Sequence, residues 1–340
     1  MSHVSRRTFL LGALGATGAV AGLAACSSGS GSAGSSGSSG SDSTTAAAPA
    51  PSAPADGMGS AQGDGVFPRT VKHYGGTTKV AARPVRVVVL GTGQLDDALV
   101  LGHAPAGATY GIGEDLIPGY LVEAFPQQAA ALKKTARLGE RTAPNLEAIE
   151  AAKPDLILGN SSQQDLYKKL SAIAPTVLTK GQGINWKADF LLMASALGAQ
   201  GDAEKALAAY AKSADGVGRA AVTVSLVAFS TGRTRMWGTR SFSGSVLTDL
   251  GYGRPDAQRF ADTSKDLSAE QLAEVDADWI FYGVQEGADV EDVVNGDLWK
   301  SLSAVRAGRA VKVAYTPWFL SAGQTAADRV VADLAKHLTK

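Results

Sequence analysis

The sequence predicts an α/β fold made of two similar lobes joined by one long helix. Apolar, strand-like runs alternate with helix-like segments from Val66 onward, which is the order expected for a parallel sheet covered by helices. A helix–strand pattern occurs twice at one constant offset, and an uninterrupted helical segment lies between the two copies. These three observations together define the predicted architecture.

The elements of the first lobe can be read in order. Residues 85–90 form a mostly β-branched run, typical of a strand buried on both faces of a parallel sheet. Residues 95–101 predict a helix that ends before a glycine. Residues 144–152 predict a second helix with Pro144 at its first position, and residues 156–158 a further buried strand.

The internal repeat indicates that the second lobe resembles the first. Glu147 aligns with Glu270 and Asp155 with Asp278 at the same offset, which favours two similar lobes over a solenoid. A second echo relates residues 98–102 to residues 247–251. Chance similarity between two amphipathic helices is the alternative explanation for this second echo.

Residues 202–216 lie between the two copies and contain no Gly or Pro before Gly216. Apolar side chains recur there at helical spacing, so one long helix is expected to join the lobes stiffly. A further amphipathic helix closes the chain. The predicted boundaries are residues 66–200 for the first lobe, 201–221 for the joining helix, 222–319 for the second lobe and 320–340 for the C-terminal helix.

Residues 1–25 have the pattern of an export signal. Arg6 and Arg7 precede a weakly apolar run that is too short to span a bilayer, and small residues then lead to Cys26, the only cysteine. These motifs resemble a bacterial lipoprotein signal of the twin-arginine type, which implies cleavage before Cys26, lipidation of its thiol and export by the twin-arginine route. The chain would then be anchored at the extracytoplasmic face of the cell membrane. An ordinary signal with an incidental cysteine is the alternative.

The lipidated cysteine opens a segment, residues 26–65, that consists almost entirely of Ser, Gly, Ala, Pro, Asp and Thr. Such a composition buries too little apolar surface to fold, so we expect a disordered linker. The chain has 32 basic and 32 acidic residues, which argues against nucleic acid as a partner. Its four histidines are scattered, so no zinc-type site is expected.

Three segments carry a resemblance to a known family, through their order and spacing: residues 83–90, 139–147 and 267–272. The resemblance covers most of residues 66–340. The segments resemble the iron-siderophore substrate-binding proteins of ABC importers, of the ferric hydroxamate or ferrichrome-binding type. The resemblance implies two Rossmann-like lobes joined by a single helix, the class III periplasmic-binding-protein fold. It also implies capture of a ferric siderophore, delivery to an ABC permease dimer with a cytoplasmic ATPase, and no enzymatic activity or resident cofactor apart from the lipid on Cys26.

In that family a surface carboxylate at the tip of each lobe docks on arginines of the permease dimer. Glu147 and Glu270 occupy the matching positions, each in the first turn of a predicted helix and beside its apolar stripe. A local role is the alternative, because acids favour helix N-termini. Ser268 and Gln271 also have the spacing of a capping box.

Ligands of open α/β sheets bind beyond the carboxyl ends of the strands, and the resemblance adds specific contacts there. Arg141 matches an arginine that contacts hydroxamate oxygens, and Trp318 matches a cleft tryptophan. Where some relatives have Trp-Gly-Arg, this chain has Arg240, Ser241 and Phe242, with Trp237 just upstream, so the contact residue among them stays open. The predicted ligand-binding residues are Tyr110, Arg141, Trp237, Arg240, Phe242 and Trp318.

A ferric hydroxamate is near-neutral and needs an aromatic wall and one or two guanidinium groups. A catecholate carries several negative charges and needs a denser arginine cluster, for which Arg233 and Arg235 would have to turn inward rather than lie exposed at a strand edge. Haem and cobalamin are further alternatives. Trp186 and Trp279 are expected to be packing residues, and Trp299 to pack at the surface.

An alternative of a different class is a secreted Rossmann-type NAD-binding oxidoreductase. Gly91 and Gly93 follow a strand and precede a helix, as in a dinucleotide-binding loop, but Asp96 stands in place of the third glycine. Its carboxylate would oppose a pyrophosphate at the helix N-terminus. No acid–base constellation with a nucleophile is visible either, so we do not predict an enzyme.

Overall fold

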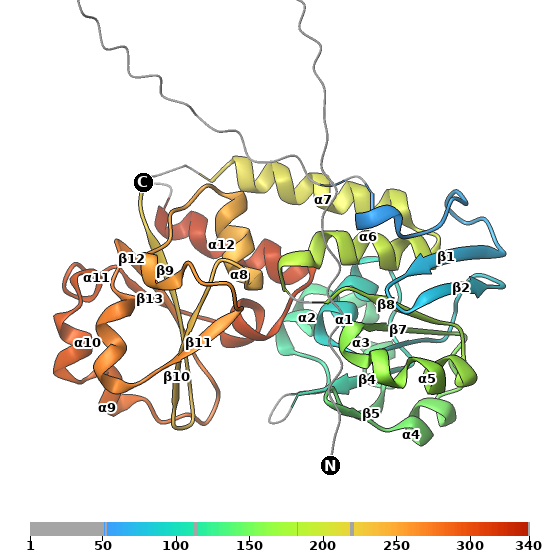
Figure 1. Ribbon diagram of the computed structural model, residues 1–340, viewed down its shortest axis with the longest axis horizontal. Coiled ribbons are helices and arrows are strands. Elements are labelled where there is room, and N and C mark those ends of the chain that lie inside the picture. The colour runs from blue at the N-terminus through green and yellow to red at the C-terminus, as the bar shows by residue number, and fades with distance from the viewer. Residues whose placement is uncertain (1–50, 52, 112–114, 182, 218–220, 339–340) are drawn as a thin grey trace, which may run out of the picture. The chain divides into compact units, whose positions relative to one another are not determined.

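The structure is a computed structural model that describes residues 51–338, except residues 52, 112–114, 182 and 218–220. The predicted signal, Cys26 and most of the predicted linker lie outside the described residues. All described residues belong to one unit of the chain, residues 45–340. Figure 1 shows two α/β halves within this unit, with helices packed around a sheet in each.

A six-stranded sheet forms the centre of the first lobe, in the order β6-β5-β4-β3-β7-β8. All neighbouring strands are parallel except β5 and β6, which are antiparallel. The central strand β3 is buried on both faces, as the β-branched run predicts. The strands are β3 (Val87–Val89), β4 (Gly107–Tyr110), β5 (Ala136–Glu140), β6 (Ala143–Pro144), β7 (Leu156–Asn160) and β8 (Thr176–Thr179).

Helices cover this sheet, and an antiparallel hairpin of β1 (Arg69–His73) and β2 (Gly76–Val80) packs beside β8. The helices are α1 (Thr92–Val100), α2 (Gly119–Ala124), α3 (Ala129–Leu132), α4 (Leu146–Ala151), α5 (Tyr167–Ile173) and α6 (Trp186–Leu197). Short 3-10 turns complete the lobe at η1 (Ala55–Gly57), η2 (Pro126–Gln128), η3 (Ser161–Leu166) and η4 (Gly183–Asn185).

The second lobe has a five-stranded sheet in the order β11-β10-β9-β12-β13. It is mixed rather than wholly parallel as predicted, because a tight turn at Gly232 (φ 66°) folds β9 back into β10. Its elements are β9 (Val224–Ser230), β10 (Arg233–Trp237), α8 (Phe242–Asp249), η5 (Asp256–Gln258), β11 (Ser264–Leu267), η6 (Ala269–Val275), β12 (Trp279–Val284), α9 (Glu291–Val294), α10 (Asp297–Ser301), α11 (Ser303–Arg306), β13 (Ala310–Val313) and the π-helical turn η7 (Thr316–Leu320).

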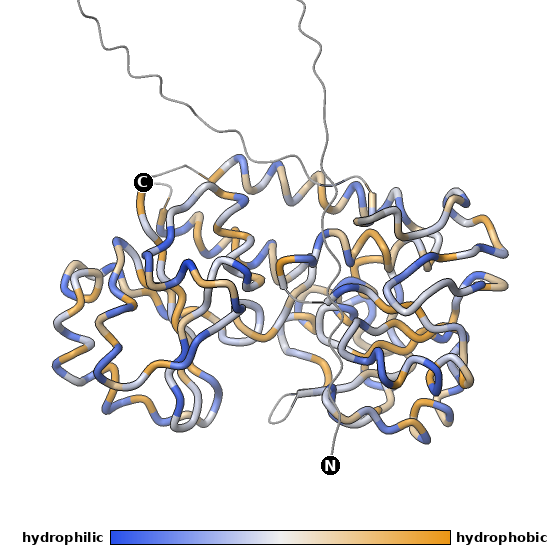
Figure 2. The backbone as a smooth tube through the Cα atoms, viewed as in Figure 1, coloured by the Kyte–Doolittle hydropathy of each residue, from blue (hydrophilic) through white to orange (hydrophobic). Residues whose placement is uncertain are grey.

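One helix joins the lobes along the chain, and a second helix packs against both of them. Helix α7 (Gln200–Asp215) runs along one side of both lobes, and α12 (Gln324–Leu338) packs against α1 and α6 of the first lobe as well as α7 and α8 (Figure 1). Both helices are amphipathic, with apolar residues on the buried face; in Figure 2, α7 alternates between hydrophobic and hydrophilic colours along its length. Among the described residues, no helix is long and apolar enough to cross a membrane.

The internal repeat corresponds to one structural device used twice. Asp155, just before β7, accepts hydrogen bonds from the backbone N–H groups of Val85 (2.8 Å) and Arg86 (2.9 Å). Asp278, just before β12, accepts one from the N–H of Thr223 at 2.7 Å. Each aspartate therefore fixes the start of the neighbouring central strand, β3 or β9, in its register.

The second echo also has a structural basis. Helices α1 and α8 both end with a glycine in the left-handed conformation, Gly102 (φ 81°) and Gly251 (φ 78°). In each case the glycine and the following residue donate hydrogen bonds back to the last turn, which is the Schellman motif. The similarity therefore reflects how two helices stop, and α8 follows β10 rather than the strand equivalent to β3.

Two sequence predictions need correction. Pro144 lies in β6 and does not begin the next helix; α4 begins after Asn145, whose side chain accepts a hydrogen bond from the N–H of Ala148. Trp299 is not a surface residue but is 4% exposed, because its ring packs edge-on against Phe229 and Tyr282.

Candidate functional site

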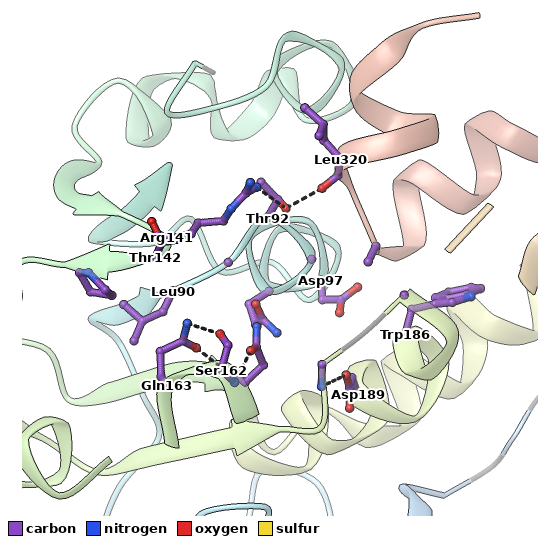
Figure 3. A pocket seen from close by; sticks show the side chains of 18 of the residues that line it. Leu90, Thr92, Asp97, Arg141, Thr142, Ser162, Gln163, Trp186, Asp189 and Leu320 are labelled. Carbon is purple, nitrogen blue, oxygen red and sulfur yellow. Dashed lines mark hydrogen bonds between the residues drawn. The ribbon is translucent and has the colours of Figure 1, made fainter. Parts of the chain in front are cut away.

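A cavity of about 580 Å³ lies between the two lobes. Most of its wall comes from the first lobe, and Trp237, Phe319, Leu320 and Ala322 contribute the second-lobe side. Figure 3 shows the residues that line it. A cavity of this size and depth falls in the range of small-molecule sites.

The carboxyl ends of parallel strands supply the cavity floor. Leu90 and Gly91 follow β3, Asn160 ends β7, and Gly181 follows β8. This is the position expected from the topology of open α/β sheets. Gly91, Thr92, Gly93, Asn160 and Ser162, which follow or end these strands, line the cavity.

Arg141 lies in the turn between β5 and β6 and reaches the cavity wall. Its Nη1 donates a hydrogen bond to Oγ1 of Thr92 at 3.3 Å, and that hydroxyl donates to the carbonyl of Leu320 at 3.0 Å (Figure 3). The chain of contacts links the β5–β6 turn, the start of α1 and the second lobe. It therefore positions a guanidinium group at the junction of the lobes.

Aromatic rings form another part of the wall. Trp237 packs against Phe319 with ring centroids 5.7 Å apart, and Trp186 is the first residue of α6. The indole N–H groups of Trp186 and Trp237 are buried and have no hydrogen-bond partner among the described residues. Buried donors are normally satisfied, so these two N–H groups indicate a place where a ligand can supply acceptors.

Two carboxylates also line the cavity. Asp189 is 7% exposed and accepts hydrogen bonds from the N–H groups of Lys180 (2.9 Å) and Gly181 (2.8 Å); burial raises its pKa to about 7. Asp97 is 2% exposed and accepts one from the N–H of Gln324 at 3.2 Å. Burial, with Asp96 and Asp189 adding, raises the pKa of Asp97 well above its usual value.

Asp96 lies behind the cavity and holds the lobes together. It is fully buried and accepts hydrogen bonds from the N–H groups of Thr325 (2.9 Å) and Ala326 (3.0 Å) at the start of α12, and from the hydroxyl of Tyr120 (3.1 Å). Burial raises its pKa. A β-carbon added at Gly323 would lie 2.5 Å from that of Asp96, so only glycine permits this close approach.

Of the predicted ligand-binding residues, the structure brings Arg141 and Trp237 together at the cavity. Trp318 lies elsewhere: it is 1% exposed, stacks on Phe281 with centroids 5.2 Å apart, and donates its indole N–H to Asp333. The ring completes the second-lobe core and does not reach the cavity. Trp318 is therefore placed as a packing residue in this structure.

Phe242 is also buried, and it packs edge-on against Trp186 with centroids 5.8 Å apart. A β-carbon added at Gly183 would lie 2.4 Å from the backbone nitrogen of Phe242, so the residue belongs to the tight junction between the lobes. Arg240 is exposed and does not line the cavity. Tyr110 lies outside the cavity lining, with the guanidinium of Arg137 3.9 Å from its ring centroid.

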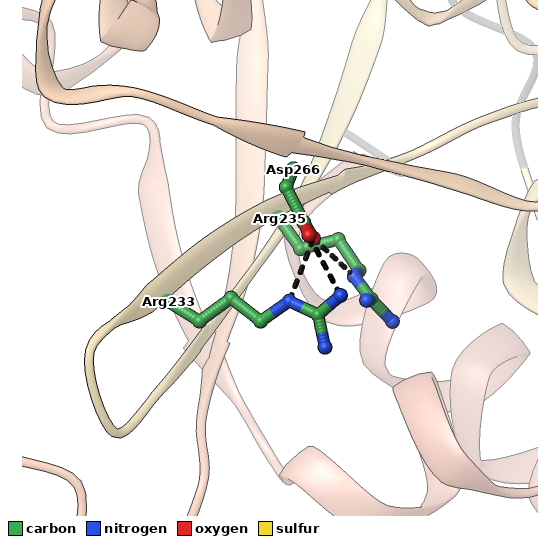
Figure 4. Close-up of polar contacts among 3 residues, drawn as sticks. All are labelled: Arg233, Arg235 and Asp266. Carbon is green, nitrogen blue, oxygen red and sulfur yellow. Dashed lines mark hydrogen bonds and ion pairs between the residues drawn. The ribbon is translucent and has the colours of Figure 1, made fainter.

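Arg233 and Arg235 lie on β10, outside the cavity lining. Both donate to the carboxylate of Asp266 on β11, Arg233 through Nε (2.8 Å) and Nη2 (2.6 Å) and Arg235 through Nε (2.8 Å) (Figure 4). The two guanidinium groups hold the pKa of Asp266 down at about 2. Their charge is thus partly neutralised within the strand pair, away from the cavity.

Glu147 and Glu270 are both exposed and lie in the first turns of α4 and η6. These two helical segments precede equivalent strands, β7 and β12, each of which pairs with a central strand. The predicted capping box of Ser268 and Gln271 is present. Hydrogen bonds from its own backbone N–H and from Ser268 lower the pKa of Glu270, so local stabilisation accounts for part of its placement.

Sequence reasoning did not identify Asp97 and Asp189, and it favoured packing over ligand contact for Trp186. The available signal was the occurrence of acids inside otherwise apolar helices, at Asp96 and Asp97 in α1 and at Asp189 in α6. Within the described part of the chain, no group of three or more His, Cys, Asp or Glu side chains is arranged to hold a metal ion.

Comparison with known proteins identifies related molecules. Residues 87–314 match the family described as periplasmic binding protein. The probable siderophore-binding lipoprotein YfiY of Bacillus subtilis (strain 168) is 32% identical over 293 residues, which cover 80% of this chain and 88% of that protein. The Fe(3+) dicitrate-binding periplasmic protein FecB of Escherichia coli (strain K12) is 29% identical over 279 residues, covering 79% and 90%.

Solved structures show the same fold. The crystal structure of Staphylococcus aureus SirA complexed with staphyloferrin B superposes with a TM-score of 0.67 and 28% sequence identity, covering 79% of this chain and 98% of SirA. The fold predicted from the sequence, two α/β lobes joined by a long helix, is confirmed by this likeness and by the observed sheets.

Proposed function

Because the chain belongs to the periplasmic binding protein family, whose members are substrate-binding transport proteins and not enzymes, we propose that it captures a ferric siderophore for an ABC importer. The observation that carries this proposal is the cavity at the carboxyl ends of β3, β7 and β8, where Arg141 and Trp237 meet. The names of YfiY and SirA, a siderophore-binding lipoprotein and a staphyloferrin B complex, support the same ligand class.

We favour a hydroxamate chelate as the ligand. Of the described residues lining the cavity, one is an arginine and none is a lysine, which suits a near-neutral chelate better than a polyanionic catecholate or citrate complex. The pairing of Arg233 and Arg235 with Asp266 removes the cations that a catecholate would need. Two relatives are named for other ligands, Fe(3+) dicitrate and staphyloferrin B. The binding experiment below therefore compares hydroxamate, catecholate and citrate chelates directly.

The proposed site of action is the extracytoplasmic face of the cell membrane. Relatives named as lipoproteins and periplasmic proteins support an extracytoplasmic location. Export by the twin-arginine route and lipidation of Cys26 remain proposals from the sequence. The predicted linker, residues 26–65, is corrected at its end, because η1 (Ala55–Gly57) and Gly59, which pairs with Lys72, belong to the first lobe. In this arrangement the soluble lobes collect the chelate and present it to the permease, and a separate ATPase supplies the energy.

Tryptophan fluorescence of the purified domain would test the function. The protein is titrated with ferrioxamine B, ferrichrome, a ferric catecholate, ferric citrate, haem, cobalamin and NAD. Saturable quenching by a ferric hydroxamate supports the proposal. Saturable quenching by the catecholate or citrate complex alone would keep the siderophore-binding function and change the proposed ligand to that class of chelate. A response to NAD, haem or cobalamin alone would overturn it.

Trp237 should report binding, whereas Trp318 should not. In the Trp237→Phe variant we expect the ligand-dependent quench to lose part of its amplitude, because this ring lines the cavity together with Trp186, which still reports binding. In the Trp318→Phe control the amplitude should be retained, since that ring is buried in the second-lobe core. The titration is run on both variants at equal protein concentration. Loss of the quench in Trp318→Phe alone would show that the ligand binds elsewhere.

Docking on the permease is proposed to use Glu147 and Glu270. With both reversed to lysine, iron uptake by cells should fall about tenfold or more, because like charges would face the permease arginines. Affinity of the purified variant for the chelate should not change, since both side chains are exposed and outside the cavity lining. Reversal of Glu204, an exposed acid on α7, is the matched control. Normal uptake by the double variant would exclude these residues from docking.

A further inference from the structure

The cavity carries charges of opposite sign at opposite edges of the first-lobe sheet. Arg141 lies in the turn between β5 and the edge strand β6. Asp189 binds the backbone that follows β8, the other edge strand, and Asp97 lies on α1, which follows the central strand β3. Figure 3 shows Arg141 on one side of the cavity and both aspartates on the other. Of the described residues that line the cavity, only these three carry a formal charge.

The two aspartates have more hydrogen-bonding capacity than the protein uses. A carboxylate can accept about four hydrogen bonds. The protein supplies three to Asp189, two from backbone N–H groups and one from the Thr179 side chain, and one to Asp97 from a backbone N–H group. No cationic side chain of the described residues lies within ion-pair distance of either carboxylate, although both are more than nine-tenths buried. Buried carboxylates are costly without such partners, so the site is suited to a donor that arrives from the cavity.

The same cavity offers donors for oxygen atoms elsewhere on its wall. The indole N–H groups of Trp186 and Trp237 lack a partner among the described residues, and the Arg141 guanidinium lies near Thr92. A ligand that fits this wall therefore has an oxygen-rich part and, separately, a part that donates hydrogen bonds. A uniformly anionic chelate can accept hydrogen bonds from the indole and guanidinium groups. It has no donor for Asp97 and Asp189, and the negative charge of these carboxylates repels it.

Building on the proposed siderophore-binding function, we propose that Asp97 and Asp189 form a subsite for a protonated amine. The ligand is then a ferric chelate that carries a cationic arm: its iron-bound oxygens lie toward Arg141, and its ammonium group lies between the two carboxylates. Binding of the ammonium replaces the missing counter-charge of the buried acids. This subsite selects amine-bearing chelates over neutral or polyanionic ones.

The subsite predicts a pH dependence whose sign follows from burial. The pKa of Asp189 is raised to about 7, so below this pH its folded-state carboxyl group is protonated and holds an ammonium only weakly. The other groups that face the two acids are Asp96 and Tyr120 behind Asp97, and Lys180 beside Asp189; Asp328 of α12 interacts with Asp96. Affinity for an amine-bearing chelate should therefore fall by about tenfold or more between pH 8 and pH 5.5, since each pH unit below the pKa removes a factor of ten in ionised carboxylate.

The test compares ferrioxamine B, which has a free primary amine, with its N-acetyl derivative, which has the same iron centre and no charge on the arm. Affinities are measured by fluorescence titration at pH 8 and pH 5.5. The proteins are the wild-type domain, Asp97→Asn, Asp189→Asn and the control Asp165→Asn, an exposed acid on η3. Asparagine keeps an oxygen that can accept the backbone hydrogen bonds, and thermal unfolding checks that each variant is folded.

The expected result is at least tenfold tighter binding of the amine probe than of the acetylated probe at pH 8. This preference should disappear in Asp97→Asn or Asp189→Asn and at pH 5.5, and it should persist in Asp165→Asn. Equal affinity of the wild-type domain for both probes would overturn the amine subsite and leave the siderophore function intact. If neither probe nor any other ferric chelate binds, the proposed function itself fails. Should one aspartate variant not fold, the probe comparison in the wild-type domain still decides the matter.

Discussion

Replacing Arg141 with leucine is expected to weaken binding of a ferric hydroxamate by roughly 10- to 150-fold. A hydrogen bond from a charged donor contributes about 1.5–3 kcal/mol, and each 1.4 kcal/mol corresponds to about a factor of ten in affinity. Arg141 is the one arginine among the described cavity-lining residues, so no neighbouring guanidinium can replace it. The dissociation constant is measured by fluorescence titration of the purified domain.

Arg137→Leu provides the matched control for this experiment. Arg137 is an exposed arginine on β5, the strand that precedes Arg141, and its guanidinium packs over Tyr110 outside the cavity. This variant should bind the chelate as tightly as the wild-type protein. If Arg141→Leu bound normally while remaining folded, the cavity assignment would have to be abandoned.

Replacing Asp96 with alanine is expected to lower the free energy of unfolding by about 3 kcal/mol. Loss of a helix N-cap costs about 1 kcal/mol, and each buried donor left without an acceptor costs about a further 1–3 kcal/mol. Asp96 caps α12 through Thr325 and Ala326 and also accepts from Tyr120. Urea denaturation followed by circular dichroism measures the change.

Asp202→Ala is the control for the Asp96 variant. Asp202 is an acid in the first turn of a helix, α7, but its side chain is 67% exposed. It should change stability by no more than a few tenths of a kcal/mol. A loss of similar size in both variants would mean that the effect of Asp96 is general electrostatics rather than its buried hydrogen bonds.

The fold was largely predictable from the sequence because each lobe repeats strong local patterns. The β-branched run at β3 and the amphipathic face of α12 are patterns of residues close together in the sequence. The aspartates Asp155 and Asp278 were found because they recur at one constant offset. The antiparallel pairing of β9 with β10 was not predicted. It depends on a single tight turn at Gly232, and the alternating apolar segments around that turn fit a parallel sheet equally well. Pro144 was misplaced because proline suits the end of a strand as well as the start of a helix.

The site was only partly predictable. Arg141 was identified from the resemblance of residues 139–147, and the structure places it at the cavity, in the turn between β5 and β6. Whether an aromatic ring faces a cavity or a core depends on the packing of distant segments, as for Trp318 against Phe281 and Phe242 against Trp186. Neither contact leaves a trace in local sequence. Asp97 and Asp189 face the cavity for the same reason, through segments far apart in the chain.

The position of α12 in the sequence affects the order in which parts of the chain can fold during synthesis. This helix is the last in the described chain, yet its first N–H groups satisfy Asp96 and Asp97 of α1, the first helix of the first lobe's sheet. A nascent chain that has not reached residue 324 therefore holds two buried acids without these donors. We therefore expect the first lobe to complete its packing only after the α12 segment has been synthesised, and a chain cut before residue 324 to be degraded faster than one that contains α12.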